Sequence, residues 1–165
     1  MSEFVYVVFE THSLTEDNES GIATGWDPGR LSPAGREQAR LLGERRRNDG
    51  LAAIFTSDLQ RALETVSIAF RDTNVPLFHD WRLRECNYGD MNGTGTATEP
   101  SDRARHIHDR YPGGESWAEA IDRVLSFIPD LSRWNGQRVL IIGHASTRWA
   151  LDHFVQGTAI DQMVA

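Results

Sequence analysis

The sequence predicts a three-layer α/β/α sandwich around a mostly parallel sheet, and three observations lead to this fold class. Short runs of β-branched and aromatic residues have the composition of strands that are covered on both faces. Segments with apolar residues at helical spacing alternate with these runs, as is typical of a parallel sheet between two helical layers. Because 165 residues fit one domain, and no linker or repeat interrupts them, we expect a single domain over residues 1–165.

A long loop separates the first predicted strand from the first predicted helix. The run Phe-Val-Tyr-Val-Val-Phe at 4–9 predicts the strand, and the polar, glycine-containing stretch at 10–30 predicts the loop. A loop of this length is uncommon in a compact domain unless it builds a site. Ser32 suits an N-cap and Pro33 suits the first helical position, so we expect a helix that runs to about Arg47.

The later elements continue the alternation of strands and helices. We expect strands at 52–56, 75–78 and 138–142, and helices at 58–70, 115–131 and 146–155. Between residues 82 and 111 glycine and proline break the pattern, and we expect there only a weak helix at 101–109. Pro129 suggests that the helix at 115–131 ends early.

Charge and composition argue against several classes of protein. The formal net charge of −7 disfavours nucleic acid as a partner. The apolar runs are too short to cross a bilayer and the first residues do not form a secretion signal, so we expect no membrane partner. The single cysteine, Cys86, excludes an intramolecular disulfide. Together these features favour a cytoplasmic protein.

Polar side chains follow several of the predicted strands. The first strand leads into Thr11 and His12, and the last strand leads into His144. Arg61 lies in the first turn of the helix after the second strand, and Glu85 lies in the irregular segment after the third. Ligands of open α/β sheets bind at the carboxyl ends of the strands, so we expect these residues to converge there.

Six motifs occur along the chain in a fixed order. They are THS at 11–13 with Asn18 six residues after His12, LSPAGREQA at 31–39, SDLQRALET at 57–65, LRECNYG at 83–89, PGGES at 112–116 and IIGHA at 141–145. In this order and spacing they resemble the histidine phosphatase superfamily, the phosphoglycerate-mutase-like enzymes, over nearly the whole chain. Any one motif is weak evidence, whereas the set strongly favours the three-layer fold.

The resemblance implies a metal-independent phosphatase that uses no cofactor and hydrolyses a small phosphorylated molecule, a phosphate monoester. In the family the first histidine is transiently phosphorylated, which makes His12 the expected nucleophile, in its neutral form. Glu85 corresponds to the proton donor, and His144 is the second catalytic histidine. Charge in phosphoryl transfer spreads over the non-bridging oxygens, so donors must face them. The expected phosphate-binding residues are Thr11, Asn18, Arg61 and Ala145.

Two departures from the family pattern affect these expectations. Thr11 stands where the family has the arginine of Arg-His-Gly, and it supplies a hydroxyl but no charge. We consider Arg148, Arg82 and Arg84 as candidates for a compensating cation. The family usually continues beyond the helix after the second histidine into another strand or two, and we expect this chain to lack them.

Other functions are compatible with the same residues. A repurposed family member would use His12, His144 and Glu85 for acid–base chemistry on a substrate without phosphate, and the replacement at Thr11 motivates this alternative. A third alternative is a pseudoenzyme that only binds a ligand. The presence of His12, Arg61, Glu85 and His144 argues against it, since a site without catalysis has no chemical need for all four. A metal site is disfavoured, because His106 and the next histidine are only two positions apart. The substrate and the oligomeric state stay open.

Overall fold

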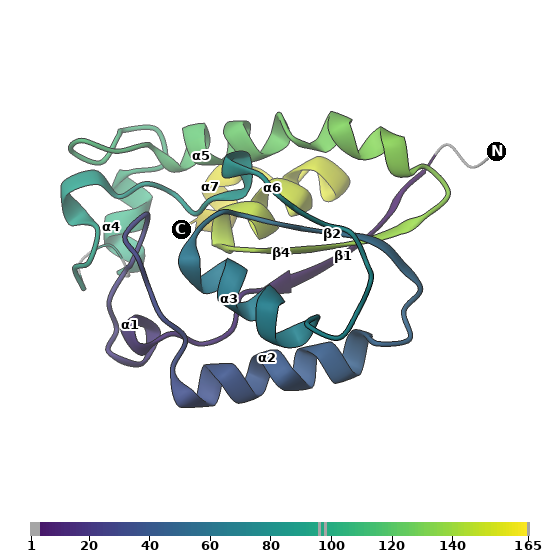
Figure 1. Cartoon of the computed structure of the whole chain (residues 1–165). Coiled ribbons are helices and arrows are strands. Elements are labelled where there is room, and N and C mark those ends of the chain that lie inside the picture. The colour runs from purple at the N-terminus through teal and green to yellow at the C-terminus, as the bar shows by residue number, and fades with distance from the viewer. Residues whose placement is uncertain (1–3, 96, 98, 165) are drawn as a thin grey trace.

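The centre of the fold is a parallel sheet (Figure 1), seen in a computed structural model that describes residues 4–95, 97 and 99–164. Within these residues the sheet has four strands in the order β1-β4-β2-β3, and all neighbours run parallel. The strands are β1 (Tyr6–Thr11), β2 (Leu51–Thr56), β3 (Leu77–His79) and β4 (Arg138–Gly143). Because β4 lies between β1 and β2, both of its faces are covered, which explains its continuous apolar run.

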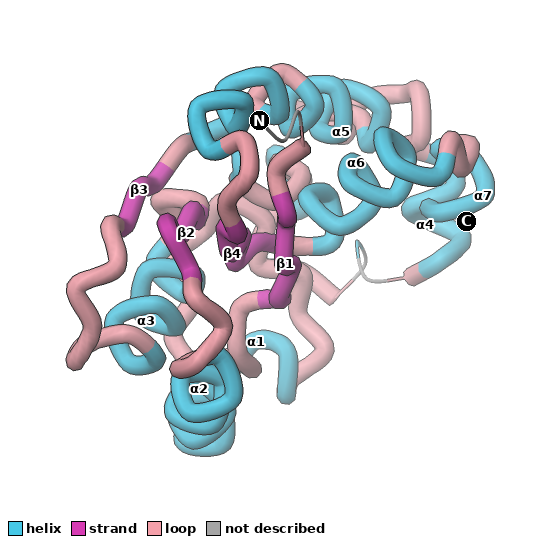
Figure 2. Tube along the Cα trace, turned by 90° about the vertical axis from the view of Figure 1, so that its right-hand side faces the viewer, coloured by secondary structure: helices cyan, strands magenta, loops and turns pink. Residues whose placement is uncertain are grey.

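Helices cover both faces of the sheet, so the predicted three-layer sandwich is confirmed. On one face α2 (Pro33–Arg46) packs against α3 (Gln60–Ala69). On the other face α5 (Trp117–Leu125) packs against α6 (Ala145–Gln156). Figure 2 shows the two helix pairs on opposite sides of the strands. No helix in the described part of the chain is long and apolar enough to cross a membrane.

The connecting segments hold short helices. These are α1 (Glu16–Glu19), α4 (Pro100–Arg105), α7 (Ile160–Val164) and the 3₁₀ segments η1 (Trp81–Leu83), η2 (Gly89–Met91) and η4 (Ile128–Trp134). Of the helix expected at 115–131, α5 covers Trp117–Leu125, so the early end that Pro129 suggests is confirmed; η4 follows and carries Pro129 in its first turn. The weak helix expected at 101–109 ends at Arg105, and α7 was not predicted.

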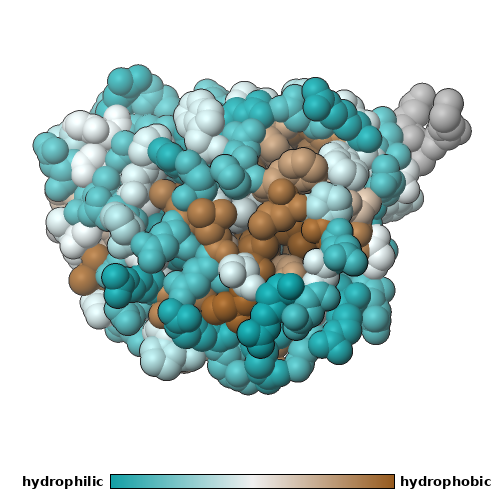
Figure 3. Space-filling model, viewed as in Figure 1, coloured by the Kyte–Doolittle hydropathy of each residue, from teal (hydrophilic) through white to brown (hydrophobic). Residues whose placement is uncertain are grey.

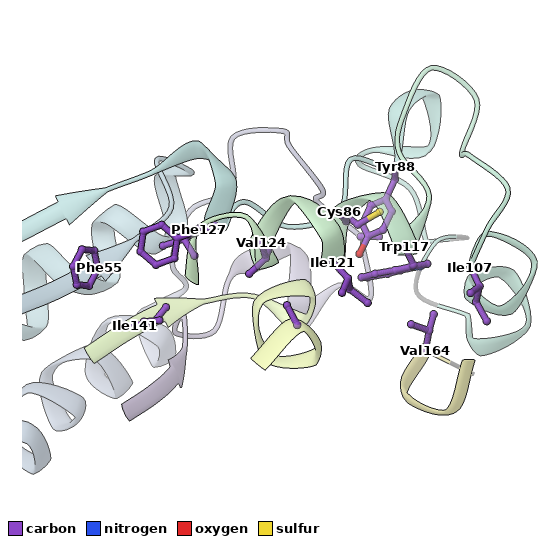
Figure 4. Packing of buried hydrophobic residues seen from close by; sticks show 14 of the residues in the cluster. Phe55, Cys86, Tyr88, Ile107, Trp117, Ile121, Val124, Phe127, Ile141 and Val164 are labelled. Atoms are coloured by element: carbon purple, nitrogen blue, oxygen red, sulfur yellow. The ribbon is translucent and has the colours of Figure 1, made fainter. Parts of the chain in front are cut away.

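Two apolar clusters, one on each face of the sheet, form the core. Along β4, Val139 and Ile141 join the larger cluster, whereas Leu140 and Ile142 join the smaller one beside α2 and α3. This alternation follows from the two-residue period of a strand. Figure 4 shows the larger cluster, which extends from the sheet along α5 toward Trp117.

One glycine of the LSPAGREQA motif lets α2 approach the loop after β1. A Cβ atom on Gly35 would lie 1.8 Å from the carbonyl oxygen of Leu14. The side chain of Ser32 accepts the N–H of Gly35 and caps the helix, as the sequence predicts. These contacts fix the segment that carries His12.

The β3 edge of the sheet is partly apolar at the surface. Leu77 is 47% exposed and Phe78 is 45% exposed. Figure 3 shows apolar residues gathered in the middle of the face seen in Figure 1. Neither Leu77 nor Phe78 is among the described residues that line the cavity of the site described next.

Candidate active site

The two motif histidines lie side by side at the carboxyl ends of β1 and β4. Thr11 pairs with Gly143 in the sheet register. The residues that follow these two, His12 and His144, are therefore neighbours. The backbone N–H of His12 donates to the carbonyl oxygen of Gly143 at 3.0 Å. The two imidazole rings have centroids 5.1 Å apart and an interplanar angle of 52°. The predicted convergence of His12 and His144 is therefore what the strand pairing produces.

Backbone contacts assign the tautomer of His12. Its Nδ1 lies 2.8 Å from the carbonyl oxygen of Ser13, which can only accept, so Nδ1 carries the proton. The Nε–H of Arg61 donates to Nε2 of His12 at 3.3 Å. Burial, followed by the charge of Arg61, lowers the pKa of His12 to about 4, against the raising effect of the Ser13 carbonyl. At neutral pH the ring is uncharged and Nε2 presents a lone pair.

A threonine of the SDLQRALET motif holds this arrangement in place. The Oγ1 of Thr65 accepts the backbone N–H of Ser13 at 3.0 Å and donates to the carbonyl oxygen of Arg61 at 2.8 Å. Thr65 thus links the loop after β1 to the first turn of α3. Sequence reasoning did not assign a role to Thr65, although its place in an intact motif was the available signal.

Arg61 is the buried cation of the site. It is 3% exposed, and its Nη2 donates to the carbonyl oxygen of Gly25 at 2.9 Å. Its Nη1 is buried without a hydrogen-bond partner among the described residues. Burial lowers the pKa of Arg61, and the nearby charge of Glu85 opposes that effect. A buried donor without a partner is costly, so this atom is suited to an anionic ligand.

His144 lies deeper than His12 and is fully buried. Its Nδ1 is 3.4 Å from Nη2 of Arg61, and its Nε2 is 2.7 Å from Oγ of Ser57. A guanidinium only donates, so Nδ1 is the acceptor and Nε2–H donates to Ser57. Burial, then the charge of Arg61, lowers the pKa of His144 well below its usual value. The N–H of His144 is thus directed to Ser57, and its other ring nitrogen accepts from Arg61.

The carboxylate of Glu85 caps the first turn of α6. It accepts the backbone N–H groups of Cys86 at 2.9 Å, Ala145 at 3.1 Å and Ser146 at 3.1 Å. These contacts fix the carboxylate at the wall of the site. Ala145 lines the cavity, and its backbone N–H donates to Glu85, so its expected role in phosphate binding stays a prediction.

Arg123 and Trp26 hold the segment that carries Glu85. Arg123 is buried, and it pairs with Glu115 of the PGGES motif through two contacts of 2.8 Å. It also donates to the carbonyl oxygen of Glu85 at 3.1 Å, as does Nε1 of Trp26 at 2.7 Å. The PGGES motif therefore acts on the site indirectly, through the position of Glu85.

A cavity of about 230 Å³ opens beside these groups. Its described lining includes His12, Asn18, Arg61, Glu85, Tyr88, Arg103, Trp117, Ala145 and Trp149. Asn18 completes the capping box of α1, whose N-cap is Thr15: its amide oxygen accepts the N–H of Thr15 at 3.1 Å, which leaves the amide NH₂ as the donor for a ligand. A larger hollow of about 740 Å³, between α2 and α3, is lined by paired surface charges and contains none of these groups.

Thr11 does not belong to this cavity in the described structure. It is exposed and faces a separate hollow beside Gln38 of α2. The carboxylate of Glu10 also points away from the site, toward Arg45 and Arg46. The hollow that Thr11 faces is also lined by His12, whereas Thr11 is absent from the described lining of the 230 Å³ cavity.

Each of the three candidates for a compensating arginine forms an ion pair with a carboxylate. Their partners are Asp80 and Asp130 for Arg82, Asp58 for Arg84, and Asp152 for Arg148. None of the three appears among the described residues that line the cavity, where Arg103 of α4 does. Sequence reasoning missed Arg103, and nothing in its local pattern marks it.

No group of three or more histidine, cysteine or acidic residues suited to a metal ion occurs among the residues that the structure describes. The geometry instead offers a neutral imidazole lone pair, a buried guanidinium and a carboxylate around a small cavity. This combination can bind an anion and carry out nucleophilic and proton-transfer steps on it.

The chain is similar to known proteins over nearly all of its length. The family model described as "Histidine phosphatase superfamily (branch 1)" matches residues 7–164. A 2,3-bisphosphoglycerate-dependent phosphoglycerate mutase of Cytophaga hutchinsonii is 31% identical over 161 residues, which cover 88% of this chain and 74% of that protein. A phosphoglycerate mutase of Schizosaccharomyces pombe is 31% identical over 176 residues, 96% of this chain and 82% of that protein.

Solved structures give the same result for the fold. Bacillus stearothermophilus YhfR has a TM-score of 0.88 at 29% identity and covers 97% of this chain and 84% of its own. A mycobacterial glucosyl-3-phosphoglycerate phosphatase has a TM-score of 0.82 at 25% identity, covering 96% of this chain and 85% of its own. Similar proteins therefore include both mutases and phosphatases.

Proposed function

The chain belongs to the histidine phosphatase superfamily, and from that premise we propose that it hydrolyses a small phosphate monoester through a phosphohistidine intermediate on His12. Members of the family are phosphatases and mutases, so the chain is an enzyme of the phosphoryl-transfer type. The proposal concerns the finer points: hydrolysis as the reaction, a monoester as the substrate, and His12 as the nucleophile.

One observation carries the proposal: Nε2 of the neutral His12 and the unpartnered Nη1 of Arg61 belong to two groups that line the same cavity. Nε2 accepts a hydrogen bond from the guanidinium of Arg61, and the Nη1 donor of that guanidinium has no partner among the described residues. A phosphoryl group between them would supply an acceptor for Nη1 and an electrophile for Nε2. Both groups are held by the protein, so little reorganisation is needed when charge develops on the phosphoryl oxygens.

In the first step, the Nε2 lone pair gives up its hydrogen bond with the Nε–H of Arg61 and forms a bond to phosphorus in line with the ester oxygen, while the P–O bond to that oxygen breaks. The leaving alkoxide takes a proton from Glu85, which must be protonated for this step. Phosphorylation makes the His12 ring cationic, and the Ser13 carbonyl at Nδ1 stabilises that charge. Arg61 faces the non-bridging oxygens throughout.

In the second step, water attacks phosphorus and gives its proton to the Glu85 carboxylate, while the P–N bond breaks. Inorganic phosphate leaves, and His12 regains its neutral lone pair. Glu85 thereby returns to the protonated state that it had at the start. His144 acts as a positioning residue, because it accepts from Nη2 of Arg61 and is itself held by Ser57.

The test is hydrolysis of p-nitrophenyl phosphate with EDTA present, together with trapping of the phosphoenzyme by rapid alkaline quench. We expect turnover in the wild type, and loss of both turnover and acid-labile phosphate in His12→Ala. His79→Ala is the matched control, because His79 also ends a strand but is exposed and lies outside the cavity.

Turnover or label that persists in His12→Ala contradicts the nucleophile assignment. If no phosphate ester labels the wild type while a ligand without phosphate binds in the cavity, the acid–base alternative replaces the phosphatase. Binding of phosphate without turnover of any ester in a panel favours the pseudoenzyme.

A further inference from the structure

The described lining of the cavity beside His12 contains a second set of residues that the proposed chemistry does not use. The groups that take part in phosphoryl transfer are His12, Arg61 and Glu85. The second set has apolar or aromatic side chains and consists of Ile22, Ala23, Ala97, Trp117 and Trp149. We call it the apolar wall. It comes from four separate segments of the chain, so the tertiary structure assembles it.

Helix α6 brings Trp149 close to the carboxylate of Glu85. The backbone N–H of Ala145, in the first turn of α6, donates to Glu85 at 3.1 Å. Trp149 follows Ala145 by four residues, so the two lie on the same face of the helix, and both line the cavity. The rise over one helical turn is about 5.4 Å. The indole is therefore about one turn of helix away from the group that protonates the leaving oxygen.

Other aromatic rings hold Trp149 in position. Its ring centroid lies 4.6 Å from that of Trp117, at an interplanar angle of 60°. Trp117 is only 1% exposed and packs in turn against Tyr88, with ring centroids 5.7 Å apart (Figure 4). Trp149 itself is half-buried. A ring that is already held in place loses little conformational entropy when a ligand packs against it.

Two of the polar groups that line the cavity with the apolar wall are directed to protein partners. The hydroxyl of Thr24 donates to the carboxylate of Asp17 at 2.8 Å, and the Nε–H of Arg103 donates to the carbonyl oxygen of Val164 at 3.4 Å. A leaving group rich in hydroxyls would lose hydrogen bonds to water that these groups do not replace. An apolar group loses nothing of this kind and gains from burial.

The size of the cavity also limits the leaving group. A cavity of about 150 Å³ is enough to hold benzene in an apolar protein interior. The volume of about 230 Å³ next to His12 therefore suits a phosphoryl group that carries a single ring.

We propose that Trp149 binds the leaving group of the substrate, and that the apolar wall selects small phosphate monoesters of aromatic or otherwise apolar alcohols. The inference rests on the proposed function and names the substrate class of that site. With the phosphoryl group between His12 and Arg61, the leaving oxygen meets Glu85, and the group attached to that oxygen continues along α6 to Trp149.

The experiment compares two alkyl esters, phenethyl phosphate and α-glycerophosphate, by measuring kcat and KM for each. Both release an alkoxide that needs a proton, so a difference between them reports contact with the rest of the leaving group. Burial of a ring against an indole strengthens binding by about tenfold or more. We expect kcat/KM of the wild type to favour phenethyl phosphate by at least that factor.

Replacement of the indole should abolish this preference. In Trp149→Ala we expect KM for phenethyl phosphate to rise about tenfold with kcat nearly unchanged, because the contact is the same in the ground state and the transition state. The kinetics of α-glycerophosphate should not change, and Trp149→Phe should keep most of the preference. Phe154→Ala is the control, since Phe154 is an aromatic residue of the same helix that is 62% exposed and absent from the described lining.

Equal kcat/KM for the two esters in the wild type overturns the proposal. An equal loss for both esters in Trp149→Ala also overturns it, because it assigns to the indole a purely structural role. Thermal unfolding verifies that each variant is folded. If Trp149→Ala does not fold, Trp149→Leu fills part of the volume without a ring and decides by the same comparison.

Two phosphonates, which are not hydrolysed, separate this inference from the proposed function. Calorimetry gives the affinities for benzylphosphonate and methylphosphonate. A wild type that hydrolyses no ester but binds benzylphosphonate more tightly, with dependence on Trp149, refutes the phosphatase and keeps the apolar wall as a binding site. A wild type that hydrolyses esters through His12 but binds both phosphonates equally keeps the phosphatase and refutes the role of Trp149.

Discussion

The Nε–H of Arg61 is directed at Nε2 of His12 across 3.3 Å, so the cation of the site lies against the atom proposed as its nucleophile. This contact has two effects. The charge of Arg61 adds to burial in lowering the pKa of His12, which keeps the ring neutral. It also places the phosphate-binding group next to the position where a P–N bond would form.

Replacement of Arg61 should remove most of the activity. In Arg61→Met the phosphoryl oxygens lose their buried donor, and we expect kcat/KM for p-nitrophenyl phosphate to fall by about 100-fold or more. Arg61→Lys should keep only part of the wild-type activity, because a lysine ammonium lacks the forked N–H groups of a guanidinium. Arg71→Met, which removes an exposed arginine just after α3, is the control. An Arg61→Met enzyme within a few-fold of the wild type would refute the role of Arg61.

The stability of the protein should depend on pH through His12. Its pKa is about 4 in the folded state and near 6.5 when unfolded, so below the unfolded value the unfolded chain binds more protons. The free energy of unfolding is then expected to fall as pH drops from 6.5 toward 4. Urea unfolding at pH 7 and pH 5 should show that the free energy of unfolding falls less in His12→Gln than in the wild type. An equal loss in both proteins contradicts the lowered pKa.

Ser57→Ala should destabilise the fold, because it removes the acceptor of the buried Nε2–H of His144. An unsatisfied buried polar group costs about 1–3 kcal/mol, to be measured by urea unfolding. Ser67→Ala, on the exposed side of α3, serves as the control and should change little. No difference between the two variants would mean that His144 does not depend on Ser57.

Glu85→Gln should affect substrates according to their leaving groups. p-Nitrophenolate leaves without protonation, whereas an alkoxide needs a proton, so hydrolysis of an alkyl phosphate should fall by about 100-fold or more and that of the aryl ester by less. The measurement is kcat for both esters, with Glu44→Gln, an exposed glutamate of α2, as the control. Equal losses for the two esters argue against Glu85 as the proton donor.

Much of the fold follows from local sequence features. The apolar run of β4 is continuous because both of its faces are buried, and Ser32 with Pro33 determines the start of α2 through capping. The structure of residues 115–131 was harder to predict, because Pro129 lies within an otherwise helical pattern and the chain continues as η4. The positions of His12 and His144 were predictable, since parallel strands deliver their carboxyl ends to one edge of the sheet.

The sequence by itself determined the three-layer fold, the family and the two histidines, because hydrophobic periodicity, helix caps and intact motifs are properties of short segments. Only the tertiary structure decided which cations face the cavity. Arg84 pairs with Asp58 and Arg82 with Asp130, whereas Arg103 reaches the cavity. The direction of a long charged side chain depends on the carboxylates and carbonyls within its reach, and the fold brings these from distant parts of the chain.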